Sequence, residues 1–437
     1  MPDLVIRGGT LVNSDSVQLA DVAIADGRIV EIGPELRGAR DEPGEEIDAR
    51  GLHVCPGLID VHVHFNEPGR TEWEGAATGS RALAAGGGTC FVDMPLNSTP
   101  CVVNAREVDR KRGALEAAAI TDFGIWGGLV PGSVPEMAAM AAHGVIGFKA
   151  FMCDSGLPEF PWADDATLVD GMREAARLGL PVAVHAETEA MVRGRSARPV
   201  DAETDAISRA VRFAADTGVA LHVVHVSSGR GVAVAAEGRA RGVDVSIETC
   251  PHYLCFTEAD IERLGAVAKC APPLRPASHQ RELWDAVLDG RVDLIASDHS
   301  PTTPERKAGA FADAWGGVAG VQSTWPSLLD RAHHERGLAL TRIAHLLAAA
   351  PARRFKIGGK GRLAPGYDAD LTLVSLSDRC TLQAADLHQR HKMSPYIGET
   401  FRGAVRRTIR RGETIFLDGR IVARTRGRFV RPEGHRA

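Results

Sequence analysis

His62 and His64 stand at alternate positions, and together they are the first sign of chemistry in this sequence. Apolar and polar residues alternate around them with the period of a β-strand, so both imidazoles point from one face. Two imidazoles that converge in this way can bind one metal ion. Glu67-Pro68-Gly69 ends the strand straight after the pair, and barrel enzymes react at the carboxyl ends of their strands. The alternative is a surface strand that happens to carry two histidines.

Lys149 is the most unusual lysine, because it lies in a short apolar run with the pattern of a strand, GFKAFM at 147–152. Lysine is rarely buried without a partner, so its ammonium group can be expected to reach solvent or an ion-pair partner. The alternative is that burial and nearby cations lower its pKa until the neutral amine reacts with carbon dioxide. The resulting carbamate is an anionic oxygen ligand that can bridge two metal ions.

Three further polar residues stand at the ends of apolar runs: His185, His225 and Asp298. Each is placed where the active site of a barrel forms. His222, three residues before His225, faces the opposite side of its strand, and we interpret it as structural.

Taken together, the candidate ligands are His62, His64, Lys149, His185, His225 and Asp298. Four imidazoles, a modified lysine and a carboxylate suffice for two divalent ions, which lower the pKa of a shared water and polarise a carbonyl group. A carboxylate close to that water, here Asp298, can pass its proton to a leaving nitrogen. The set therefore predicts hydrolysis of an amide. We expect His252 and His299 beside the ligands rather than among them.

Eight short apolar runs alternate with alanine-rich helical stretches, which predicts parallel strands connected by helices. Eight repeats favour a (β/α)8 barrel. The predicted strands are 57–64, 88–93, 122–130, 145–151, 181–185, 219–225, 243–249 and 292–297. The predicted helices are 74–86, 104–118, 134–142, 165–178, 202–217 and 229–241. The stretch 300–320, rich in proline, glycine and charge, is expected as a mobile loop over the barrel mouth.

Both ends of the chain read as short strands with tight turns, including Asp26-Gly27 between two alternating apolar runs. Neither end has enough strands to form a sandwich alone, so we expect the two to meet in one small β domain. The predicted fold is α/β, a barrel over residues 55–364 with a small β domain built from residues 1–54 and 365–437.

Composition excludes several classes of function. The 437 residues carry a formal net charge of -5 and only 5% aromatic residues, so nothing resembles a nucleic-acid or membrane-binding surface. No apolar run approaches a membrane span of roughly 20 residues, and the N-terminus lacks a secretory pattern. The eight cysteines include no Cys-x-x-Cys pair, which favours reduced thiols. We therefore expect a cytoplasmic protein with a small-molecule substrate.

Several long strings of this sequence resemble the amidohydrolase superfamily, in its branch of dihydroorotases, hydantoinases, dihydropyrimidinases and allantoinases. The resemblance runs nearly end to end and is strongest to the allantoinases. The similar strings are HVHFNEPGRTEWEG at 62–75, MPLNS at 94–98, KAFMCDSG at 149–156, KCAPPLR at 269–275 and AWGG at 314–317.

This resemblance implies a distorted TIM barrel with a β-sandwich from both termini, and a homotetramer. It implies that His62 and His64 bind one metal ion, that His185 and His225 bind the second, that carboxylated Lys149 bridges the two, and that Asp298 is a ligand and the general base. Zinc suits such ligands, and so do cobalt, manganese and iron.

The same resemblance separates the substrates of the branch. Dihydroorotases carry arginine two residues after the second histidine, where it binds the substrate carboxylate. Asn66 stands there in this sequence and cannot neutralise a carboxylate. Hydantoinases carry a tyrosine several residues beyond the bridging lysine, whereas this chain has Met152-Cys153-Asp154-Ser155. The substrate contacts implied are Asn66, Asn97 and Cys153, with backbone groups at Ala271 and Ala319.

The activity implied is hydrolytic opening of the hydantoin ring of allantoin to allantoate, in purine breakdown. One alternative is a hydantoinase or dihydropyrimidinase. The second alternative is a non-catalytic scaffold protein with this fold. One feature departs from the family pattern: only 40 positions separate His185 from His225, where a longer loop is expected.

Overall fold

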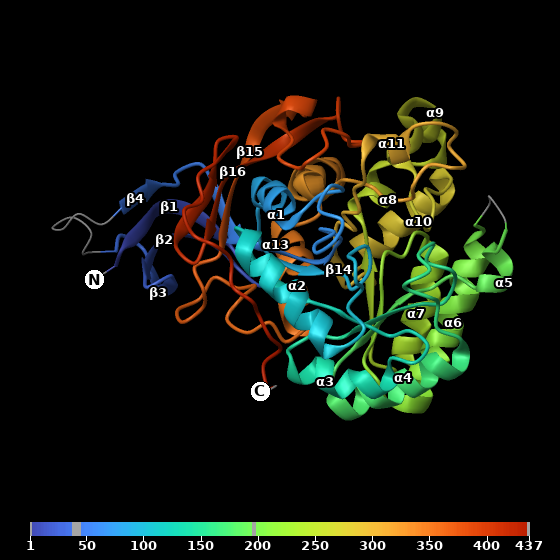
Figure 1. Ribbon diagram of the computed structural model, residues 1–437. Coiled ribbons are helices and arrows are strands. Elements are labelled where there is room, and N and C mark those ends of the chain that lie inside the picture. The colour runs from blue at the N-terminus through green and yellow to red at the C-terminus, as the bar shows by residue number, and fades with distance from the viewer. Residues whose placement is uncertain (1, 37–44, 195–197, 435–437) are drawn as a thin grey trace.

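Parallel strands in the middle of the chain form a barrel (Figure 1). The computed structural model describes residues 2–36, 45–194 and 198–434. The barrel strands are β6 (Leu58–Val63), β7 (Gly88–Asp93), β8 (Asp122–Ile125), β9 (Gly127–Gly128), β10 (Phe148–Phe151), β11 (Val182–His185), β12 (Leu221–Val223), β13 (Val245–Thr249) and β14 (Leu294–Ile295). Only Trp126 separates β8 from β9, so these two are one bent strand. The predicted eight-stranded barrel is confirmed.

The barrel closes beside the first histidine pair. Its strands form a sheet of three, β6 to β8, and a sheet of six, β9 to β14. A parallel bridge between Val63, at the end of β6, and His299, in the segment after β14, closes the barrel. Trp126 is fully buried at the bend and donates from Nε1 to the carbonyl of Val61 at 2.9 Å.

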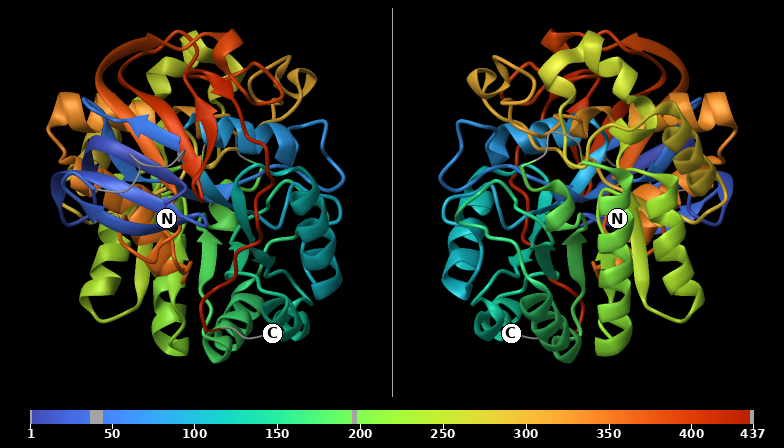
Figure 2. Two further views of the ribbon diagram at one scale, coloured as in Figure 1. Left: turned by 90° about the vertical axis from the view of Figure 1, so that its left-hand side faces the viewer. Right: turned by 90° about the vertical axis from the view of Figure 1, so that its right-hand side faces the viewer.

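Helices cover the outside of the barrel, with α4, α6 and α7 side by side on one flank (Figure 2). The main helices are α1 (Ala76–Ala85), α2 (Ala105–Ala118), α3 (Met137–Ala142), α4 (Asp165–Leu178), α6 (Val200–Thr217), α7 (Gly229–Ala240) and α10 (Ala277–Leu288). Side chains begin several of them, because Asn104, Asp164 and Ser228 each accept a hydrogen bond from a backbone N–H of the first turn. The six predicted helices match these elements within a few residues.

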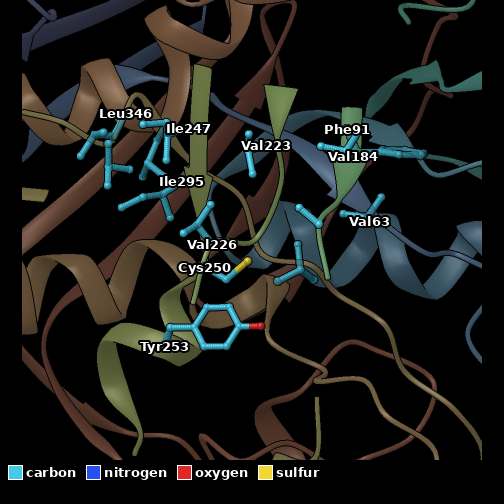
Figure 3. Packing of buried hydrophobic residues seen from close by; sticks show 14 of the residues in the cluster. Val63, Phe91, Val184, Val223, Val226, Ile247, Cys250, Tyr253, Ile295 and Leu346 are labelled. Atoms are coloured by element: carbon cyan, nitrogen blue, oxygen red, sulfur yellow. The ribbon is translucent and has the colours of Figure 1, made fainter. Parts of the chain in front are cut away.

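Shorter helical segments fill the connections. They are α5 (Glu189–Val192), α8 (Pro251–Cys255), α9 (Ile261–Leu264), α11 (Pro304–Lys307), α12 (Thr324–Ser327), α13 (Leu340–Ala344) and α14 (Ala350–Arg354), with π-helical turns at Leu328–His334 and His345–Ala349 and 3-10 turns at Val134–Glu136, Glu258–Asp260, Gly265–Ala268, Val321–Ser323 and Ala384–Asp386. Leu346 in the second π-helical turn packs beside Ile247 and Ile295 (Figure 3), so buried aliphatic side chains join strands to surrounding helices. Among the described helices, none is both long and apolar enough to cross a membrane.

Strands from both ends of the chain form the second part of the fold. The order in this nine-stranded sheet is β18-β17-β16-β15-β5-β1-β2-β3, with β4 also paired to β1. The strands are β1 (Leu4–Val12), β2 (Val17–Ala25), β3 (Arg28–Gly33), β4 (Glu45–Asp48), β5 (His53–Pro56), β15 (Leu371–Thr381), β16 (Thr400–Arg410), β17 (Glu413–Leu417) and β18 (Arg420–Ile421). Strand β5 pairs with both β1 and β15, so hydrogen bonds join the two halves of the expected sandwich.

The boundaries between the barrel and the nine-stranded sheet differ in two places from those expected from the sequence. Strand β5 ends at Pro56 and β6 begins at Leu58, so the proposed boundary after residue 54 falls inside a strand of the sheet. The last described residues leave the sheet and run along the barrel (Figure 2). There, Val430 donates to the carbonyl of Phe123 at 2.8 Å. The division into 1–54, 55–364 and 365–437 stays a proposal. Strand β5 crosses its first boundary, and the last described residues pack on the barrel and not on the sheet.

Candidate metal centre

A cavity of about 530 Å³ opens at the carboxyl ends of the barrel strands. Five of the six candidate ligands line it: His62 near the end of β6, His64 just after β6, His185 at the end of β11, His225 after β12, and Asp298 after β14. The sixth, Lys149 in β10, lies behind them, and its side chain is fully buried. The structure thus brings together all six residues from five different strands.

Asp298 lies between the first two histidines. Its Oδ1 is 3.3 Å from Nε2 of His62 and 3.5 Å from Nε2 of His64. Burial would raise the pKa of the Asp298 carboxyl, but the imidazoles of His62 and His64 hold it well below its usual range, so the group is ionised. His62, His225 and Asp298 each offer a ligand atom within 4.8 Å of the other two, and this cluster is a place for a cation, with His64 beside the same carboxylate.

A second pair of nitrogens faces the same cavity. Nδ1 of His185 lies 3.0 Å from Nε2 of His225. Burial lowers the pKa of His185 to about 4 and that of His225 well below its ordinary value. Both imidazoles are therefore neutral, which is the form that binds a metal. The backbone at His225 has a φ of 40° and that at Asp298 a φ of 45°, so two of the candidate ligands sit on strained positions at strand ends.

Lys149 is the best test of whether the group fits metal ions. Its Nζ is buried and has no hydrogen-bond partner among the described residues. Burial lowers its pKa to about 7, although Glu248 and Asp298 act in the opposite direction. In its neutral form this buried amine can be carboxylated, and the carbamate would place an anionic oxygen ligand among the four imidazoles. The residues present therefore fit a pair of divalent ions.

Two buried glutamates orient the histidines, and the sequence analysis missed both. Glu248 in β13 lies 2.8 Å from Nδ1 of His62 and 3.1 Å from Nε2 of His222. Glu187 lies 2.7 Å from Nε2 of His185. A carboxylate that accepts the far N–H of an imidazole leaves the near nitrogen free for a metal. His222, bonded to Glu248 and Ser246, has the buried structural environment expected for it.

Asn97 occupies the corresponding place behind His64, with its side-chain amide 3.1 Å from Nδ1. The Oδ1 atom of Asn97 has no partner among the described residues. Exchange of the amide oxygen and nitrogen would place this acceptor against Nδ1–H and free Nε2 for a metal. Asn97 also lines the cavity, so it is a candidate contact for both the histidine and the substrate.

The other residues expected to touch the substrate divide into two groups. Ala271 lines the cavity, whereas Asn66, Cys153 and Ala319 do not. Asn66 is fully buried, with Nδ2 3.4 Å from the carbonyl of Asn97. Cys153 lies beneath the side chain of Arg198, and the Ala319 carbonyl accepts from Ser394 instead. Asn66, Cys153 and Ala319 therefore lie behind the residues that line the cavity.

The expected loop over the barrel mouth supplies one side of the cavity. Arg306 lines it, together with residues 313–317. The Arg306 guanidinium lies 4.6 Å from the ring of Trp73 and 5.2 Å from that of Trp315. His299 accepts at Nδ1 from the N–H groups of residues 320 and 321, so it anchors the end of this loop.

A barrel with two sets of metal-ligand candidates at the carboxyl ends of its strands defines a class, the metal-dependent hydrolases. The profile of the Amidohydrolase family matches residues 53–415, and the chain belongs to this family. It is 57% identical to an allantoinase of Solibacter usitatus over 100% of this chain and 98% of the relative. It is 54% identical to an allantoinase of Rubrobacter xylanophilus over 99% and 98%.

Solved structures give the same fold. An L-hydantoinase (dihydropyrimidinase) from Arthrobacter aurescens superposes with a TM-score of 0.95 at 31% identity, over 99% of this chain and all of the other. A dihydropyrimidinase from Brevibacillus agri NCHU1002 has a TM-score of 0.91 at 27% identity, over 99% of both chains. The barrel with its β-sandwich is thus shared with a hydantoinase and a dihydropyrimidinase.

Proposed function

We propose that this protein is an allantoinase, which opens the hydantoin ring of allantoin by hydrolysis to give allantoate in purine breakdown. The observation that carries this proposal is identity of 45–57% with allantoinases over 98% or more of the chain. The cavity supports it, because candidate ligands for two metal ions meet there.

The ligand assignment is part of the proposal. His62, His64 and Asp298 would hold one ion, His185 and His225 would hold the other, and Lys149, once carboxylated, would be a ligand shared by the two. When bound, the two divalent ions lower the pKa of the attacking water and polarise the carbonyl under attack. Zinc suits this set, and so do cobalt, manganese and iron, since imidazole nitrogens and carboxylate oxygens coordinate all of these metals.

Asp298 is the proposed general base. Its carboxylate is ionised and lies within 3.5 Å of two of the ligand nitrogens, so it reaches the water that attacks the ring. It takes the proton of that water and gives it to the ring nitrogen that leaves as the amide bond breaks. Asn97 and the backbone of Ala271 line the same cavity and orient the ring.

The proposed substrate is uncharged. Asn66 stands in place of the arginine by which dihydroorotases bind a carboxylate, and no tyrosine stands among the described residues that line the cavity. Both features favour a neutral hydantoin with a substituent over the other rings of the branch. We further propose a cytoplasmic homotetramer, and light scattering of the purified protein would measure that assembly.

Initial rates on racemic allantoin, dihydroorotate, hydantoin and dihydrouracil test the function, with protein expressed in added divalent metal and bicarbonate. Turnover of allantoin well above the other three is the expected result. Faster opening of hydantoin or dihydrouracil would instead identify a hydantoinase or dihydropyrimidinase. Protein that holds close to no metal and hydrolyses none of the four would be a scaffold.

A further inference from the structure

Arg198 lies in the cavity wall, and the metal-site proposal gives its side chain no role. It precedes α6, in the short connection between β11 and β12. Its side chain is 25% exposed, whereas that of Glu187 beside it is completely buried. A guanidinium that is partly open to a reaction cavity is a candidate for contact with the substrate.

One edge of the Arg198 guanidinium is fixed. Nε donates to both oxygens of Glu187 at 3.0 Å, and Nη2 donates to Oε2 at 2.6 Å. Nη2 also lies 3.3 Å from Sγ of Cys153, and burial raises the pKa of that thiol to about 12, so it is neutral. The second terminal nitrogen, Nη1, has no hydrogen-bond partner within the described ranges.

The fixed edge places Arg198 close to the candidate ligands. The same Oε2 atom of Glu187 lies 2.7 Å from Nε2 of His185. The guanidinium is therefore one carboxylate oxygen away from a histidine that faces the reaction centre. Glu187 already supplies the negative charge that balances the guanidinium, so Nη1 can donate to a neutral oxygen atom and leave no charge unpaired.

The two other cations among the described residues of the cavity wall contact other groups. Lys269 donates to the carbonyl of Ala312 at 2.5 Å. The Arg306 guanidinium packs against the rings of Trp73 and Trp315. Of the three cationic side chains in the wall, Arg198 is the one held against a candidate metal ligand.

We propose that Nη1 of Arg198 donates a hydrogen bond to the oxygen of the exocyclic ureido group of allantoin, and so makes Arg198 a specificity-determining residue. The inference rests on the proposed function. In allantoin the ureido group is bonded to the ring carbon next to the carbonyl that is attacked. When that carbonyl lies over the ligands, the ureido group lies against the neighbouring wall, where Arg198 stands.

Arg198→Gln and Arg198→Lys test this pairing by comparing two ring compounds. The quantities measured are the KM for allantoin and the inhibition constant of hydantoin, which lacks the ureido group. A lost hydrogen bond from a charged donor corresponds to a rise in KM of about 10- to 100-fold, with the hydantoin constant within about 2-fold of wild type. Arg198→Lys keeps a positive charge beside Glu187 but has no second donor edge, so it should show the same selective rise with metal retained.

Arg193→Gln is the matched control, because Arg193 is an exposed arginine of the same connection, paired with Glu189. It should leave both constants unchanged. Equal losses for allantoin and hydantoin in the Arg198 variants, or no loss, would overturn the inference and leave the proposed function intact. A wild-type protein that opens hydantoin but not allantoin would overturn the proposed function itself.

Discussion

Nδ1 of His185 and Nε2 of His225 lie 3.0 Å apart, although 40 positions separate the two residues in the sequence. They end neighbouring parallel strands, so the barrel rather than the connection brings them together. Glu187 accepts from the far nitrogen of His185, which leaves Nδ1 with its lone pair towards His225. The short connection therefore leaves the second ligand pair intact.

Replacement of Lys149 should remove metal and activity together. Lys149→Ala deletes the amine, and Lys149→Arg keeps a cation that cannot be carboxylated. Losing several kcal/mol of charge stabilisation by metal lowers kcat about 1,000-fold or more. Metal content by mass spectrometry and the rate on allantoin are the measurements. Lys356→Ala, at an exposed lysine, is the control, and a Lys149→Ala protein with full metal and full rate would refute the carbamate bridge.

Loading of metal-free protein should depend on pH through the same lysine. Burial lowers the pKa of Lys149 to about 7, so the side chain is an ammonium below that pH and a neutral amine above it. Only the amine reacts with carbon dioxide. At one fixed concentration of dissolved 13C-labelled carbon dioxide, kept constant by raising the bicarbonate with the pH, the carbamate signal in the NMR spectrum should grow faster as the pH rises from about 6 to 8. Growth at one rate across this range would contradict the assignment.

Glu248→Gln should weaken metal binding, although Glu248 is not itself a proposed metal ligand. The carboxylate faces Nδ1 of His62 and Nε2 of His222 and accepts from the backbone N–H of His225 at 3.0 Å. Loss of such an orienting group lowers metal affinity or activity about 10- to 100-fold. Competition with a chelator measures the affinity. Glu282→Gln changes an exposed carboxylate in the same way and should have no effect, so equal affinities in both variants would argue against the role of Glu248.

The sequence predicts the ligand set because the period of a strand places side chains on known faces. His62 and His64 alternate within one predicted strand. Lys149 lies within another apolar run, and His185, His225 and Asp298 each stand at the end of a further run. Eight such runs suffice for a barrel, and a barrel brings strand ends together regardless of their distance along the chain. The fold and the meeting of the six candidates thus follow from local patterns.

The residues that the sequence analysis missed depend on contacts between strands. Glu248 was visible as a carboxylate in an otherwise buried run, and Glu187 stands two residues after a candidate ligand, but neither pattern shows which imidazole it faces. Asn66 and Cys153 were expected to contact the substrate, but neither lines the cavity. Their position in a motif does not reveal which neighbouring side chains cover them. Arg198 covers Cys153, and no local signal predicts that contact.

Lys360 should carry much of the contact between the sheet and the barrel. Its buried Nζ lies 2.8 Å from Asp122 at the start of β8, 3.0 Å from Asp368 and 2.6 Å from Asp370, which precedes β15. Lys360→Met removes the cation and leaves buried carboxylates without it, which costs about 3–5 kcal/mol of stability.

The pH dependence of this variant separates lost charge from lost packing. Burial raises the pKa of Asp370 even beside Lys360, so without the lysine its carboxyl gains a proton more readily as the pH falls. A protonated carboxyl costs less to bury, and the drop in Tm should be smaller near pH 5 than near pH 8. Lys356→Met, at an exposed lysine bound to the carbonyl of Gly179, is the control. An equal drop at both pH values would mean that Lys360 stabilises the junction by packing alone.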